Sequence, residues 1–293
     1  MNMRQECGLP EDAEILDCDG VRLAVKREGQ GWPLVCLHAV AHGGRDFEKL
    51  SATLGNCFQV IRIDWPDHGR SGPDSQPPSA RRYAEILEIA LQKLQVTQPI
   101  ILGNSIGGGA AIHYAARQPV RALVLCDSAG LVPVNAMVRG IVSLFVRFFR
   151  AGEGGAGWFG SAYRFYYRHM VLPQAAAAEQ RQRIIDAGYE YAPLLRAAWE
   201  GFGQPEADIR EMAAGLDMPV WCAWAKGDRV IPLWMCKPAI KALRQGSLST
   251  FKGGHSAFME QPDAFLQGFM AFCEGLPSAP TVAAKKEVRH AVS

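Results

Sequence analysis

Short apolar runs alternate with amphipathic stretches in the first half of the chain. The stretch 80–94 places its apolar residues at helical spacing, and helices are also predicted at 45–54 and 106–118. The apolar runs have the length of buried strands, and they lie at 34–37, 58–63, 100–102 and 120–126. Buried strands that alternate with helices indicate a mostly parallel sheet covered by helices on both faces. The pattern therefore predicts an α/β fold.

This alternation stops near residue 131 and resumes near residue 219. The residues between read as helices at 137–150, 175–187 and 192–199, with a flexible Gly-rich break at 152–160. The final helix is expected at 256–274. We therefore predict a core of two parts, 13–132 and 216–276, with a helical cap inserted at 133–215 and flexible tails at 1–12 and 277–293.

Composition narrows the class of protein. The net charge is +2 without long runs of one sign, so nothing indicates a nucleic-acid partner. Eight cysteines occur without a C-x-x-C pair, which argues against a zinc or thioredoxin-like site, and we expect no metal. Cys36, Cys126 and Cys222 fall in apolar runs and are expected to be buried, as suits a reducing compartment. With neither a secretory signal nor a run long enough for a membrane span, the expected location is cytoplasmic.

The predicted helix Met137–Arg150 is strongly amphipathic. It combines Leu144, Phe148 and other apolar residues with arginines such as Arg147. Such a helix can lie on a lipid surface or in a dimer contact. We favour a lid helix packed over the active site.

The motif Gly103-Asn104-Ser105-Ile106-Gly107 follows an apolar run and precedes a helical stretch. A strand, a tight turn and a helix around G-x-S-x-G are typical of a nucleophile elbow, in which the serine sits at the apex of a strained turn. Small residues two positions before and two after the serine give that turn its room. Ser105 is therefore the candidate nucleophile.

A nucleophilic serine needs a base, and the base needs an orienting acid. Asp228 and His255 each follow a predicted strand, where parallel sheets place their sites. Asp127, which follows the strand at 120–126, is an alternative acid. The order serine, aspartate, histidine is that of the α/β-hydrolase fold.

From about Asp17 to Glu274 the sequence resembles a capped serine hydrolase of the α/β-hydrolase fold superfamily, esterase-like and similar to the meta-cleavage product C–C hydrolases. The similar segments are Leu37-His38 with its small-residue loop, Asp64-x-Pro-x-His68-Gly69-Arg70-Ser71, the elbow, Gly227-Asp228 and Gly254-His255 followed by Glu260-x-Pro262. Two positions depart from the family's pattern, because Ala39 and Asp67 stand where glycine is usual.

The resemblance implies a mechanism without a cofactor. His255 takes the proton of Ser105, Asp228 orients the imidazole, and the backbone N–H groups of Ile106 and Val40 face the oxyanion. It also implies candidates for substrate binding, Asn104, His42 and Arg183, although for His42 an exposed polar residue is the simpler reading. His38 and His68 are expected to be structural.

Three functions remain open. We favour a carboxylesterase for a small or medium ester, lactone or thioester. The alternative is a C–C bond hydrolase, a group that resembles this chain at the elbow and tends to bind its substrate carboxylate through a cap arginine, here Arg181 or Arg183. That group usually has tryptophan after the catalytic histidine, where this chain has Ser256. The third reading, from a different class, is a hydrolase-fold protein that binds a small molecule without turnover.

Overall fold

A computed structural model describes residues 3–276, and it is built around one eight-stranded sheet with the order β1-β2-β4-β3-β5-β6-β7-β8. The strands from β4 to β8 in this order run parallel, whereas β1 and β2 are antiparallel to their neighbours. The predicted fold class is confirmed. The strands are β1 (Glu14–Cys18), β2 (Val21–Glu28), β3 (Trp32–Leu37), β4 (Phe58–Ile63), β5 (Ile100–Asn104), β6 (Ala122–Cys126), β7 (Val220–Ala225) and β8 (Gly246–Phe251).

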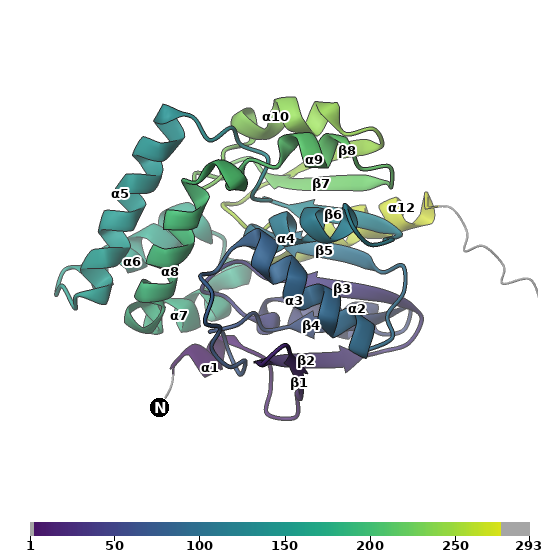
Figure 1. The fold of residues 1–293 in the computed structure, drawn as a ribbon, viewed down its shortest axis with the longest axis horizontal. Coiled ribbons are helices and arrows are strands. Elements are labelled where there is room, and N and C mark those ends of the chain that lie inside the picture. The colour runs from purple at the N-terminus through teal and green to yellow at the C-terminus, as the bar shows by residue number, and fades with distance from the viewer. Residues whose placement is uncertain (1–2, 277–293) are drawn as a thin grey trace, which may run out of the picture.

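The central strands β5, β6 and β7 are buried along their whole length, because helices cover both faces of the sheet (Figure 1). This explains why their sequences are continuous apolar runs rather than alternating ones. The core helices are α1 (Met3–Cys7), α2 (Glu48–Leu54), α3 (Ala80–Lys93), α4 (Ile106–Ala115), α10 (Leu233–Ala242), α11 (Ala257–Glu260) and α12 (Pro262–Glu274), with a 3-10 turn, η1, at Gly44–Phe47.

The chain between β6 and β7 forms a helical segment, most of which gathers at one end of the sheet, whereas its last helix lies beside α10 (Figure 1). Its two longest helices, α5 and α8, pack together through aromatic rings, and the Phe145 and Trp199 ring centroids are 4.0 Å apart. The segment contains α5 (Ala136–Glu153), α6 (Phe159–Tyr166), α7 (Ala178–Asp186), α8 (Gly188–Phe202) and α9 (Arg210–Ala214), with short turns η2 (Tyr167–Val171), η3 (Ala175–Ala177) and η4 (Pro205–Ala207).

The prediction of a flexible tail at residues 1–12 is wrong for residues 3–12, the part of this stretch that the structure describes. Residues 3–7 form α1, and Cys7 and Leu9 are buried. Gly8 lies so close to Gly69 that a Cβ there would be 2.3 Å from the Gly69 Cα, and the Leu9 N–H donates to Asp64. This stretch is polar in sequence but is held by contacts from a distant loop. The tail expected at 277–293 lies outside the described residues.

Two details of the helical prediction also differ. The break expected at 152–160 is short, because α5 runs to Glu153 and α6 begins at Phe159, whose buried ring packs on Phe148 and Tyr163. The single final helix is divided, with α11 ending at Glu260 and Pro262 beginning α12. Proline suits the first turn of a helix and not its interior. Within residues 3–276, no helix is both long and apolar enough to cross a membrane.

Candidate active site

Ser105 occupies the tight turn between β5 and α4. Its φ of 54° and ψ of −121° lie in a region that residues with a side chain rarely adopt. The turn is held by backbone bonds from the Ser105 N–H to Cys126 O (3.1 Å) and from the Ala129 N–H to Ser105 O (2.9 Å). Gly107 allows the close approach, because a Cβ there would be 2.4 Å from Leu37 O. The structure therefore has the strained elbow geometry that the motif predicts.

His255 and Asp228 come together at the carboxyl ends of the last two strands. His255 follows β8, Asp228 follows β7, and His255 Nδ1 is 2.8 Å from Asp228 Oδ2. Asp228 Oδ1 accepts the N–H groups of Val230 and Ile231, at 2.7 and 2.9 Å, so the loop fixes the carboxylate. Burial is the largest single effect and opposes the charged imidazolium, but the charge and hydrogen bond of Asp228, with the charges of Asp127 and Glu260, together outweigh it, and the pKa of His255 is raised. With Nδ1 engaged, Nε2 is the nitrogen left to exchange a proton.

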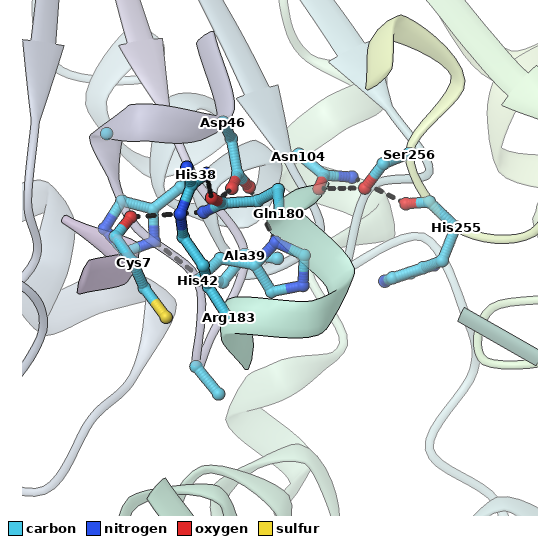
Figure 2. A network of polar contacts seen from close by, with 12 residues as sticks. Cys7, His38, Ala39, His42, Asp46, Asn104, Gln180, Arg183, His255 and Ser256 are labelled. Carbon is cyan, nitrogen blue, oxygen red and sulfur yellow. Dashed lines mark hydrogen bonds and ion pairs between the residues drawn. The ribbon is translucent and has the colours of Figure 1, made fainter. Parts of the chain in front are cut away.

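Asn104, the last residue of β5, joins this pair to the strand that ends beside Ser105. Its side-chain amide donates to His255 O (2.9 Å) and to Cys126 O (3.0 Å), and its oxygen accepts from Ser256 Oγ (2.8 Å) (Figure 2). Asn104 is fully buried. Its polar atoms are thus used to tie the residue beside Ser105 to the loop of His255. These bonds are structural, and a substrate contact by Asn104 stays a prediction.

Asp127 has a different set of partners. Its carboxylate accepts the N–H groups of Ala225 (2.8 Å) and Ala257 (3.3 Å), and it is fully buried. Burial, with a smaller effect from the charge of Asp228, raises the pKa of Asp127 well above its usual value. The side chain therefore joins the ends of neighbouring strands, and the ring of His255 pairs with Asp228.

The loop after β3 carries the other predicted backbone donor, Val40. Two buried histidines support it: His38 Nδ1 is 2.7 Å from Ala39 O, and the Ala41 N–H donates to His68 Nε2 (2.8 Å). The ring of His38 also accepts from the N–H of Trp65 (2.9 Å). Both histidines are structural, as expected, and burial lowers the pKa of each, that of His68 to about 3.

The two departures from the family's glycines are accommodated differently. The loop reaches a positive φ at Ala41 (62°) rather than at Ala39, so the missing glycine at 39 costs no strain. Asp67 does adopt a positive φ of 64°, a conformation that aspartate tolerates better than most residues. The substitutions therefore leave the path of both loops intact.

Two residues that were predicted to contact the substrate, His42 and Arg183, lie away from the cavity that contains Ser105. His42 is buried rather than exposed, and its Nδ1 is 2.6 Å from Asp46 Oδ2. Arg183 bonds Glu179 and Gln180 on its own helix and lines a second, smaller cavity of about 240 Å³. Arg181 donates to the backbone oxygens of Leu172 and Gln174. None of the three lines the cavity that contains Ser105.

That cavity has a volume of about 610 Å³ and lies between the sheet and the helical segment. Most of its lining is apolar, and it includes Val142, Trp199, Ile209, Ile231 and Met235. The predicted lid helix, α5, borders it through Val138, Ile141 and Val142. Met137 and Leu144 on the same helix are exposed. The site can therefore hold an apolar group of moderate size against Ser105.

Several buried polar residues at the site gave little signal in the sequence. Glu260 accepts the N–H groups of Gly254 (2.6 Å) and Gln174 (3.1 Å), and so ties the His255 loop to the helical segment. Gln180 donates to Asp46 (2.8 Å) across 134 positions of sequence. Only the E-x-P pattern after His255 pointed to Glu260, and no local pattern pointed to Gln180.

Comparison with known proteins agrees with this geometry. The sequence model of the Alpha/beta hydrolase family matches residues 34–267, and the chain belongs to that family. It is 30% identical over 266 residues to a pimeloyl-[acyl-carrier protein] methyl ester esterase of Stenotrophomonas maltophilia, covering 86% of this chain and 96% of that one. A putative non-heme haloperoxidase of Mycobacterium phage D29 is 35% identical over 118 residues, which are 39% of this chain and 42% of its own.

The fold is shared with solved esterase structures. An esterase from Exiguobacterium antarcticum superposes with a TM-score of 0.76 at 17% identity, over 89% of this chain and 99% of that one. An esterase of a Rhodococcus species gives 0.75 at 22% identity, over 90% and 98%. At these identities the likeness concerns the fold alone. The predicted enzyme class, an α/β-hydrolase of esterase type, is confirmed at the level of the family.

Proposed function

We propose that this α/β-hydrolase is a carboxylesterase that uses Ser105, His255 and Asp228 as its catalytic triad. The observation that carries the proposal is the chain of contacts from Asp228 through His255 to Asn104, the residue before the strained Ser105. These contacts tie the loop of the proposed base to the residue before the proposed nucleophile, and Ser105 lines an apolar cavity.

The reaction follows the chemistry of these groups. Ser105 Oγ attacks the ester carbonyl carbon while its proton passes to His255 Nε2, and the charge of Asp228 stabilises the resulting imidazolium. His255 returns the proton to the departing alkoxide, which leaves as the alcohol. Water then loses a proton to His255, attacks the acyl-enzyme, and releases the acid and free Ser105.

The carbonyl oxygen becomes negative at each attack, and we assign the N–H groups of Ile106 and Val40 to it. Ile106 begins α4, so its amide belongs to the positive end of that helix. Among residues 3–276 the Val40 amide has no protein acceptor, which leaves it available to a ligand. One such donor is typically worth about 3 kcal/mol of barrier.

The choice of Asp228 over Asp127 rests on the hydrogen bond to His255. Asp228 bonds Nδ1 at 2.8 Å, whereas the oxygens of Asp127 bond backbone amides. A triad acid has to fix the tautomer of the histidine, and only a carboxylate bonded to the ring does so.

The apolar cavity supports an ester whose acyl or alcohol group is hydrophobic. The curated relative at 30% identity is named for a methyl ester, which also favours ester cleavage. The C–C alternative has less support, because Arg181 and Arg183 lie away from the cavity and the Ser256 hydroxyl is bonded to Asn104. The lipid or dimer contact of Met137–Arg150 stays a prediction beside this role.

Hydrolysis of p-nitrophenyl acetate, butyrate and octanoate tests the proposal. Ser105→Ala should lower kcat by about 10⁴-fold or more, because the nucleophile is lost. Ser247→Ala, at an exposed serine on β8, is the matched control and should retain the wild-type rate. Equal rates for wild type and Ser105→Ala would favour the non-catalytic binding protein.

The same preparation separates the two enzyme readings. A 2-hydroxy-6-oxo-dienoic acid is added, and the loss of its chromophore is followed. Slow bleaching with rapid ester turnover is expected. Rapid bleaching with feeble ester hydrolysis would instead establish the C–C hydrolase.

A further inference from the structure

The loop around Val40 is held on both sides, while the Val40 amide has no acceptor within the described part of the chain, residues 3–276. On one side, Ala39 O is bonded to the ring of His38 and the Ala41 N–H donates to the ring of His68. On the other side, the Gly44 N–H donates to Asp64 Oδ1 (2.7 Å). Between these anchors lies His42, whose N–H donates to Ala39 O (3.3 Å). The position of the predicted oxyanion donor therefore depends on where His42 is held.

His42 is held from the helical segment. Its ring bonds Asp46 Oδ2, and Gln180 Nε2 of α7 donates to Asp46 Oδ1 at 2.8 Å. Gln180 Nε2 also donates to Cys7 O at 3.1 Å, and Tyr191 of α8 donates to His42 O at 3.2 Å. Figure 2 shows Gln180 reaching from its helix to Asp46 and Cys7, next to the ring of His42. The buried Asp46 carboxylate thus joins the turn of His42 to α7, and Gln180 and Tyr191 extend this network to Cys7 and α8.

We propose that Gln180 is a positioning residue, which acts through Asp46 and His42 to hold the backbone N–H of Val40 where the oxyanion forms. This inference rests on the proposed esterase function and deepens it. The helical segment would then contribute to the barrier of the reaction and not only to the shape of the cavity.

The physical argument starts from the burial of Asp46, whose side chain is 0% exposed. Each oxygen of a buried carboxylate needs a donor, and here Oδ2 has His42 and Oδ1 has Gln180. Without Gln180, Oδ1 loses its side-chain donor, so the carboxylate has to rotate or admit water. Either change moves the ring of His42, two residues from Val40. A displacement of about 1 Å at an oriented group can cost about 10²-fold in rate.

A positioning role and a purely structural role predict different kinetics. Loss of folded protein lowers the number of active sites but not the turnover of each site. A misplaced oxyanion donor lowers kcat for every active site and leaves KM nearly unchanged, because the donor acts mainly in the transition state.

Gln180→Leu is the test, and Gln182→Leu on the same helix is the matched control. Gln182 bonds the exposed Asp186 and does not reach the loop. Active sites are counted by titration with a fluorophosphonate, and kcat and KM for p-nitrophenyl butyrate are then measured. We expect kcat per active site to fall about 10- to 100-fold in Gln180→Leu, with KM within about twofold, and no change in the control.

A trifluoromethyl ketone adds to the serine and places a negative oxygen at the same position. Its inhibition constant should rise in Gln180→Leu by about the factor lost from kcat/KM. If the kcat per titrated site and this constant both stay at wild-type values, the inference is wrong. The proposed function would stand in that case, since its failure appears separately as equal rates in wild type and Ser105→Ala.

A swapped pair guards against a variant that merely folds badly. When Asp46→Asn is combined with Gln180→Glu, the amide introduced at position 46 can donate to the carboxylate introduced at position 180, while the amide oxygen still accepts from His42. Gln180→Glu alone instead places two carboxylates together, and both variants that contain Gln180→Glu lose the donor to Cys7 O. The double variant should therefore have a higher kcat per site than Gln180→Glu alone, and a double variant no better than that single one would count against the network.

Discussion

The molecule contains two buried histidine–aspartate pairs that look alike in isolation. His255 Nδ1 is 2.8 Å from Asp228, and His42 Nδ1 is 2.6 Å from Asp46. All four side chains are no more than 4% exposed. A search for a hydrogen-bonded pair alone would return both as candidates for the base and acid of a triad.

Their surroundings separate them. The Asp228 carboxylate is fixed by backbone amides of its own loop, and His255 is tied through Asn104 to the strand of Ser105. Asp46 is instead held by a side chain of the helical segment, and the pair lies within one short turn of sequence. The comparison teaches that the base is identified by its link to the nucleophile, not by its link to an acid.

The largest expected difference between the pairs comes from replacing each acid by its amide. Asp228→Asn should lower kcat by about 10⁴-fold, because the amide no longer holds the productive tautomer of His255. Asp46→Asn should lower kcat only about 10- to 100-fold, through the position of Val40. Both are measured as kcat per titrated active site. Equal losses from the two substitutions would mean that the roles of the pairs are not distinct.

The pH dependence of kcat/KM should distinguish the pairs next. Burial lowers the pKa of His255, but the charge and hydrogen bond of Asp228, with the charges of Asp127 and Glu260, together outweigh it, so the pKa is raised above the ordinary 6.5. A general base must be neutral, so activity should fall as the pH drops through a pKa above about 6.5.

Replacing each of the two aspartates should shift this fall in activity at low pH, the acid limb of the pH profile, differently. Asp228→Asn removes the largest effect that raises the pKa, so its residual activity should show the limb at lower pH. Asp46→Asn should leave the limb in place, because the charges that raise the pKa of His255 are those of Asp228, Asp127 and Glu260. A limb that moved with Asp46 instead would reverse the assignment.

The smallest effect on activity is expected at the third buried acid, Asp127. Burial already disfavours its charged form, and asparagine keeps one acceptor for the amide of Ala225. Asp127→Asn should change kcat by less than about threefold, and the lost contact should lower the free energy of unfolding by about 1–3 kcal/mol. Urea denaturation and kcat are measured on the same preparation. If Asp127→Asn abolished activity while Asp228→Asn preserved it, the triad acid would be Asp127.

The elements that could be predicted from the sequence are those with a local pattern. The buried strands and the elbow of Ser105 lie within a few residues of the glycines or apolar runs that require them. Asp228 and His255 could be placed at the same edge because each follows a strand of a parallel sheet. The fold and the main site candidates followed from such patterns.

The elements that were missed depend on partners far away in the chain. Helix α6 follows a Gly-rich stretch, and it is stabilised by the burial of Phe159 and Tyr163 in an aromatic cluster. His42 is a lone polar residue in the sequence, and its burial requires Asp46 and, beyond it, Gln180. Periodicity within a window of sequence contains no information on such tertiary contacts.

The contact between the His255 loop and η2 has a mechanical consequence. The His255 N–H donates to Val171 O at 2.7 Å, and Glu260 binds the N–H of Gln174 just beyond it. If the helical segment opens to admit a bulky ester, swinging it out as one body would break the bonds that seat the base. Any opening that admits substrate without losing the alignment of His255 therefore has to leave Val171 and Gln174 in place.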